Sequence, residues 1–76
     1  METIYIVDEG NVLEKNDLIA RTTIWACIGN SEDYSQTGIK VAGPVPGLFA
    51  ERMIAGLKTL LERLGYQVIV ETTADD

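Results

Sequence analysis

The chain has 76 residues, of which 46% are hydrophobic and 24% are charged, and its net charge is −6. We expect a single domain over residues 1–76, because a chain of this length holds one core, and its apolar content excludes a disordered protein. The longest apolar run, residues 24–28, is far shorter than the roughly 20 residues of a membrane-spanning helix. The excess of carboxylates disfavours direct binding to nucleic acid or to an anionic membrane, because both depend on basic side chains. Neutral or basic protein partners are favoured instead.

The sequence lacks the residue types that most enzymes and metal sites use. It has no histidine, and its one cysteine, Cys27, excludes an internal disulfide. Phosphate-binding and calcium-binding loop motifs are missing as well. Three pairs of adjacent carboxylates fall in predicted turns or in the tail, where water solvates them: Asp8 with Glu9, Glu32 with Asp33, and Asp75 with Asp76. We therefore expect a non-enzymatic protein without catalytic residues, metal or cofactor.

The cellular compartment is indicated by the cysteine content and by the start of the chain. A single thiol fits a reducing compartment. The first residues show neither the basic segment nor the long apolar run of a secretory signal. We expect a cytoplasmic protein.

Two strands are predicted in the first part of the chain. Residues 3–8 are β-branched and aromatic, and a turn-like segment follows at 8–11. Residues 11–18 fit either one helical turn or a wide hairpin loop. Residues 19–28 alternate with a period of two, and we expect their small or apolar side chains at even positions to face the core.

The rest of the chain predicts one helix between two strands. We expect a loop at 29–38, a short strand at 38–42, and a break at 43–47, where prolines interrupt β-pairing. Helical spacing over residues 47–64 predicts a helix with one core-facing stripe, made of Ala50, Met53, Ile54, Leu57, Leu60, Leu61 and Leu64. Gly65 suits the left-handed residue that ends a helix, residues 66–72 form the last strand, and residues 73–76 form a frayed tail.

The predicted order β-β-β-α-β places the protein in the α+β class, with an antiparallel sheet and one helix packed on one face. One helix covers only one face of such a sheet. We therefore expect the second face to be open to water or to a partner.

Trp25 is the first candidate binding residue. The period of two places it opposite the core face, beside Arg21 and Thr23. Tryptophan and arginine dominate interface hot spots, so this group is a candidate protein-binding surface. The alternative is that the register is inverted, or that Trp25 packs under the edge of the helix.

The acidic loop formed by Glu32, Asp33 and Tyr34 is the second candidate. It could present two charges and a ring to a basic partner. The alternative is a solvated loop tip without a binding role.

Two kinds of protein resemble this chain. The element order over residues 3–72, with Pro46 and Gly47 before the helix, resembles the HicB-type antitoxin domain. That family carries Glu-Glu-Ala near the helix start, whereas residues 48–51 here are Leu-Phe-Ala-Glu. In size and charge the chain is also similar to small acidic phage-encoded inhibitors, including anti-CRISPR proteins. That resemblance implies a non-enzymatic protein that blocks a nucleic-acid-binding machine by occupying its surface.

Together these inferences predict an acidic protein-binding module, an inhibitor from a phage or mobile element. It would occupy a basic surface of a host nucleic-acid-handling complex, with Trp25 and Arg21 as the anchor and with Glu32 and Asp33 steering the approach. The alternative is a homodimeric structural, assembly or antitoxin-like domain whose open sheet face mediates self-association.

Overall fold

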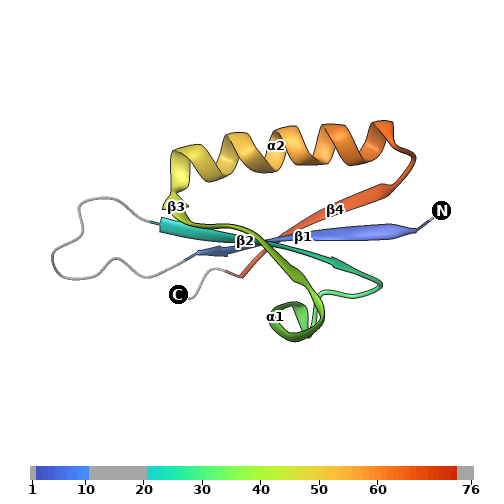
Figure 1. Ribbon diagram of the computed structural model, residues 1–76, viewed down its shortest axis with the longest axis horizontal. Helices are drawn as coiled ribbons and strands as arrows, with labels where there is room; N and C mark the ends of the chain where they lie inside the picture. The colour runs from blue at the N-terminus through green and yellow to red at the C-terminus, as the bar shows by residue number, and fades with distance from the viewer. Residues whose placement is uncertain (1, 11–20, 74–76) are drawn as a thin grey trace, which may run out of the picture.

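The computed structural model describes residues 2–10 and 21–73, and within them the strands form one mixed sheet in the order β3-β2-β1-β4. The elements are β1 (Thr3–Gly10), β2 (Arg21–Ile28), α1 (Tyr34–Thr37), β3 (Ile39–Pro46), α2 (Gly47–Arg63) and β4 (Gln67–Thr72). Helix α2 crosses one face of the sheet, and the single turn α1 lies on the other side (Figure 1). The predicted α+β class is confirmed. The predictions for residues 11–18 and for the end of the tail at 74–76 lie outside the described residues.

The sheet is mixed, so the predicted antiparallel sheet is wrong in one pairing. β1 and β3 both run antiparallel to β2, whereas β4 pairs parallel with β1. The 17 residues of α2 span about 25 Å, close to the length of an eight-residue strand, and carry the chain back to the end where β3 began. β4 therefore runs in the direction of β3, which is also the direction of β1.

The core lies between α2 and the central strands. Ile6 and Ile24 are fully buried there against Ala50 of α2, with Ile54, Leu57 and Leu61 among the partly buried side chains around them. Ile24 is one of the even-numbered positions of β2 that the alternation predicted to face the core, and Ile6 lies on the same face of β1. The exclusion of this apolar surface from water is the main force that holds α2 on the sheet.

Helix α2 ends as predicted. Gly65 has a φ of +100°, its N–H donates to the carbonyl of Glu62, and the N–H of Tyr66 donates to the carbonyl of Leu61. This double hydrogen bond is the Schellman motif, which satisfies carbonyl groups that the last helical turn leaves open. The tight reversal brings the chain directly into β4.

Two strands are longer than predicted. β1 continues through the expected turn to Gly10, and β3 continues through the expected break to Pro46. β3 accommodates its prolines because it is an edge strand and has one extra residue between Val45 and Ala42 and another between Ala42 and Lys40. Bulges and edge positions are where a sheet tolerates proline, since a missing N–H there breaks no ladder hydrogen bond.

The second face of the sheet is covered at its centre, which corrects the expectation of an open face. Val7, Thr23 and Cys27 point away from α2, yet they are 0%, 6% and 3% exposed. The segment between β2 and β3 folds back over this face and forms α1 within the predicted loop (Figure 1). Helix α2 therefore covers one face of the sheet, and the connection between β2 and β3 covers the centre of the other face.

Candidate functional site

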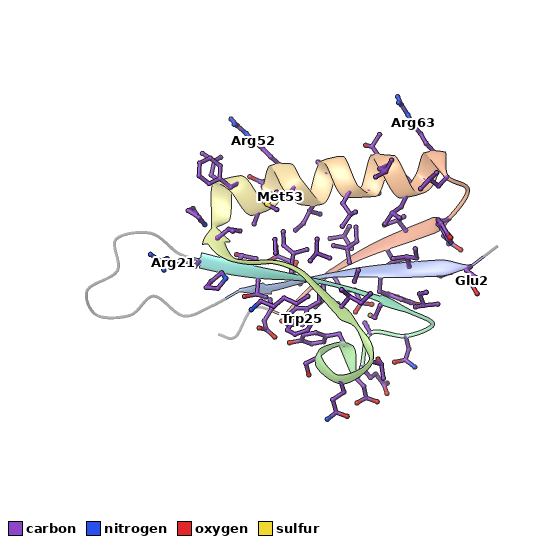
Figure 2. The ribbon with its side chains drawn as sticks, in the orientation of Figure 1. Glu2, Arg21, Trp25, Arg52, Met53 and Arg63 are labelled. Atoms are coloured by element: carbon purple, nitrogen blue, oxygen red, sulfur yellow. The ribbon has the colours of Figure 1, made fainter. Side chains whose placement is uncertain are left out.

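Trp25 and Tyr34 form the centre of the α1 side of the sheet. Their ring centroids are 5.7 Å apart with an angle of 64° between the planes, an edge-to-face contact. Trp25 lies on the same side of the sheet as α1 (Figure 2). The expected register of Trp25, opposite the core face, is thus confirmed. Tyr34 joins this aromatic pair instead of extending into solvent.

Two hydroxyl groups of the connection donate hydrogen bonds to carboxylates on the sheet. Ser31 Oγ donates to Oε2 of Glu71 on β4, and the Tyr34 hydroxyl donates to Oε2 of Glu9 on β1. Hydrogen bonds to charged acceptors are stronger than those between neutral groups. Together with the ring contact, they attach residues 31–34 to three strands of the sheet.

Beneath this connection the polar side chains are shielded from water. Burial, and then the nearby carboxylate of Glu71, raise the pKa of the Cys27 thiol. A protonated, buried thiol is a weak nucleophile, so Cys27 acts as a small apolar side chain. The indole Nε1–H of Trp25 is also buried and has no acceptor among the described residues.

The turn before α1 presents two exposed carboxylates, Glu32 and Asp33. The backbone N–H of Glu32 donates to Asn30 Oδ1, and the carbonyl of Asp33 accepts from the backbone N–H and the hydroxyl of Thr37. These local bonds fix the conformation of the turn. The backbone that carries the two carboxylates is therefore held in place next to Tyr34.

The predicted site residues are only partly brought together. Glu32, Asp33 and Arg21 are exposed, Trp25 and Tyr34 are half-buried, and Thr23 is buried. Arg21 is the first residue of β2, whereas the acidic turn follows the last residue of that strand. Figure 2 shows Arg21 at one end of the sheet. The surface that remains accessible on this side is the acidic turn and the outer edge of the aromatic pair.

Charge is distributed unevenly between the two sides of the described structure. Carboxylates outnumber basic groups on the α1 side, where Glu9, Glu32, Asp33 and Glu71 stand against Arg21 and Lys40. The outward part of α2 has the reverse balance, with Arg52, Lys58 and Arg63 against Glu51 and Glu62. Arg52 and Arg63 point away from the sheet (Figure 2). Among the described residues, the side chains named here give a carboxylate excess on the α1 side and a basic excess on the outward part of α2.

An exposed apolar stripe on α2 was missed by the sequence analysis. Three side chains predicted to face the core, Met53, Leu60 and Leu64, are 41%, 55% and 65% exposed, and Phe49 is 55% exposed. They share one flank of α2, which we call the α2 stripe, on the opposite side of the helix from Glu51. The helical spacing grouped all seven apolar positions into one stripe, whereas the sheet covers only Ala50, Ile54, Leu57 and Leu61.

Asp8 lies on the α2 side of the sheet. Burial raises the pKa of its carboxyl group, and the nearby negative charge of Glu51 raises it further. A catalytic pair of carboxylates needs an enclosed site, whereas Glu51 is exposed on the helix surface. Desolvation and like-charge repulsion explain the shift of Asp8 without a substrate pocket.

Neither a metal site nor a membrane span is formed by the described residues. Within 2–10 and 21–73, no three acidic or cysteine side chains gather closely enough to hold a metal ion. Helices in the same ranges are too short or too polar to cross a bilayer. Comparison of the chain with protein families, known proteins and solved structures finds no match.

Proposed function

We propose that this protein is a non-enzymatic, acidic protein-binding module that occupies a basic surface of a nucleic-acid-handling complex. In this proposal it is an inhibitor of phage or mobile-element type. The observation that carries the proposal is the acidic turn, with Glu32 and Asp33 exposed beside a ring pair anchored to the sheet.

Preorganisation of this turn favours binding. A loop that is already ordered loses less conformational entropy when a partner docks. Here the turn is fixed from within by Asn30 and Thr37, and from below by the bonds of Ser31 and Tyr34 to the sheet. Its two charges can therefore meet basic groups of a partner without reordering.

The uneven charge distribution favours one orientation of approach. A negative surface is attracted to the basic grooves in which other proteins hold nucleic acid, and the attraction speeds encounter. The basic side chains of α2 are repelled by such a groove, so that helix faces away from it. The mechanism is steric: the bound module takes the place of the phosphate backbone.

The experiment is a competition with DNA on purified RNA-guided nuclease complexes. Binding of fluorescently labelled duplex DNA is followed by anisotropy while the protein is added. We expect the protein to reduce DNA binding by at least one complex, and the double variant Glu32→Lys/Asp33→Lys to lose this effect.

The matched control is the double variant Glu51→Lys/Glu62→Lys, which makes the same change in net charge at exposed positions on α2. If the acidic turn makes a local contact with the complex, we expect the control variant to reduce DNA binding as the wild type does. Inhibition lost equally in both variants would show that only net charge acts, and an absence of competition with every complex tested would overturn the proposal.

A further inference from the structure

The two edges of the sheet are unequal. β3 carries Lys40, two prolines and two bulges, which are the devices that proteins use to prevent an edge strand from pairing with another chain. β4 has no lysine, proline or bulge, and its pairing with β1 is regular over all six residues. In the described structure, β4 has a strand neighbour on one side only.

Two backbone hydrogen bonds, one at each end of β4, show which of its backbone groups face outward. The N–H of Gln67 donates to the carbonyl of Glu2, and the N–H of Thr73 donates to the carbonyl of Asp8. In a strand, successive residues direct their N–H and C=O groups to alternate sides. The odd-numbered residues of β4 therefore bond to β1, and Val68, Val70 and Thr72 direct their backbone groups to the free edge.

We propose that two copies of this chain pair along β4 as antiparallel strands, about a two-fold axis perpendicular to the sheet at Ile69. In this register Val68 lies opposite Val70 of the second copy and exchanges two hydrogen bonds with it, and Val70 does the same with Val68 of that copy. Ile69 lies opposite Ile69 of the second copy. The two sheets then form one continuous sheet.

A second copy is favoured over an unrelated peptide because the edge is complementary to itself. An antiparallel pair places side chains of opposing residues on the same face, so Val68 and Val70 meet on the α2 side and the two Ile69 side chains meet on the α1 side. Val70 is 40% exposed in the single chain, and pairing buries it. The one charged residue of β4, Glu71, lies opposite Gln67 and not opposite another carboxylate.

Net charge opposes this association at long range. Each copy carries −6, and added salt screens the repulsion. The dimer is therefore expected to be tighter in high salt than in low salt, which is opposite to the behaviour expected for the acidic turn with a basic partner. The proposal does not rest on the proposed function, since the axis leaves the acidic turns of both copies uncovered on the same side of the sheet.

The test is the molecular mass of the full chain by sedimentation and light scattering, from micromolar to millimolar concentration, at low and high salt. We expect twice the monomer mass, with tighter association in high salt. Val70→Lys is expected to weaken dimerisation by roughly tenfold or more, because a charge on an edge strand opposes pairing. Val41→Lys on β3 is the matched control, since Val41 is 43% exposed on the guarded edge, and this variant is expected to remain dimeric.

Val70→Pro is the second variant. It removes an N–H that faces the free edge and leaves the bonds to β1, and circular dichroism checks that it folds. A Cys27→Ser/Ile69→Cys variant is expected to form a disulfide-linked dimer on oxidation, whereas Cys27→Ser/Val41→Cys is not. A wild-type chain that stays monomeric at every concentration overturns the proposal, and so does a dimer that Val70→Lys leaves unchanged.

Discussion

The ring of Tyr34 meets the ring of Trp25 edge to face, at a centroid distance of 5.7 Å. This contact joins the connection after β2 to the face of the sheet that α2 does not cover. It helps to explain why Val7 and Cys27 are buried on the side of the sheet where α1 is the one helical turn among the described residues. The centre of the second face is thus covered by a connection that an aromatic pair and two hydroxyl–carboxylate bonds hold in place.

Removal of Tyr34 should therefore open this face. We expect Tyr34→Ala to lower the free energy of unfolding by about 2 kcal/mol, because it loses both the ring contact and the bond to Glu9. Tyr34→Phe keeps the ring and should cost about 1 kcal/mol. Trp25 is the only tryptophan, so its fluorescence should shift to longer wavelength in Tyr34→Ala alone. Equal emission spectra for the two variants would contradict this account.

Burial distinguishes the two sets of apolar side chains that the sequence placed in one core. Ile24 is fully buried, and Ile24→Ala is expected to destabilise the fold by about 2–5 kcal/mol. Leu60 is 55% exposed, and Leu60→Ala should cost about 1 kcal/mol or less. Urea denaturation measures both values. A loss for Leu60→Ala as large as that for Ile24→Ala would mean that the α2 stripe is covered in solution.

Gly43 allows the close approach of β3 to β2. Its φ is +129°, and a Cβ at this position would lie 2.6 Å from the Cα of Thr23. Gly43→Ala is therefore expected to destabilise the protein by about 1–3 kcal/mol. Gly56→Ala is the control, because a Cβ there meets nothing within 4 Å, and on a helix it should stabilise by about 0.5–1 kcal/mol. Thermal melting of the two variants should shift in opposite directions.

The contribution of Asp8 to the free energy of unfolding falls as pH rises. Burial and Glu51 raise the folded-state pKa of Asp8 above its ordinary value of 3.8, so the folded state holds this proton more tightly than the unfolded state. Stability from Asp8 is therefore greatest below pH 3.8 and is lost as pH rises through the folded pKa.

Asp8→Asn removes the charge and its desolvation. Relative to the wild type, we expect a higher melting temperature at pH 7 and a difference that vanishes or reverses below pH 3.8. Glu51→Gln should give a smaller gain, because the carboxylate of Glu51 is the lesser of the two causes. A pH-independent effect of Asp8→Asn would exclude titration of Asp8 as its origin.

Local patterns in the sequence determined most of the elements. The period of two placed Ile24 toward the core and Trp25 on the opposite face, and helical spacing with Gly65 predicted α2 and its end. These predictions hold because side-chain direction follows from backbone geometry within one strand or helix.

Only the tertiary structure decided how these elements are combined. The parallel pairing of β4 follows from where α2 returns the chain, and the passage of β3 through Pro44 depends on its place at the edge of the sheet. The exposure of Leu60 depends on how much of α2 the sheet can cover. The role of Tyr34 depends on the chain folding back, so that Tyr34 contacts Trp25, nine residues earlier. Each of these outcomes is set by contacts between residues distant along the chain, and local periodicity carries no information about them because one pattern fits several packings.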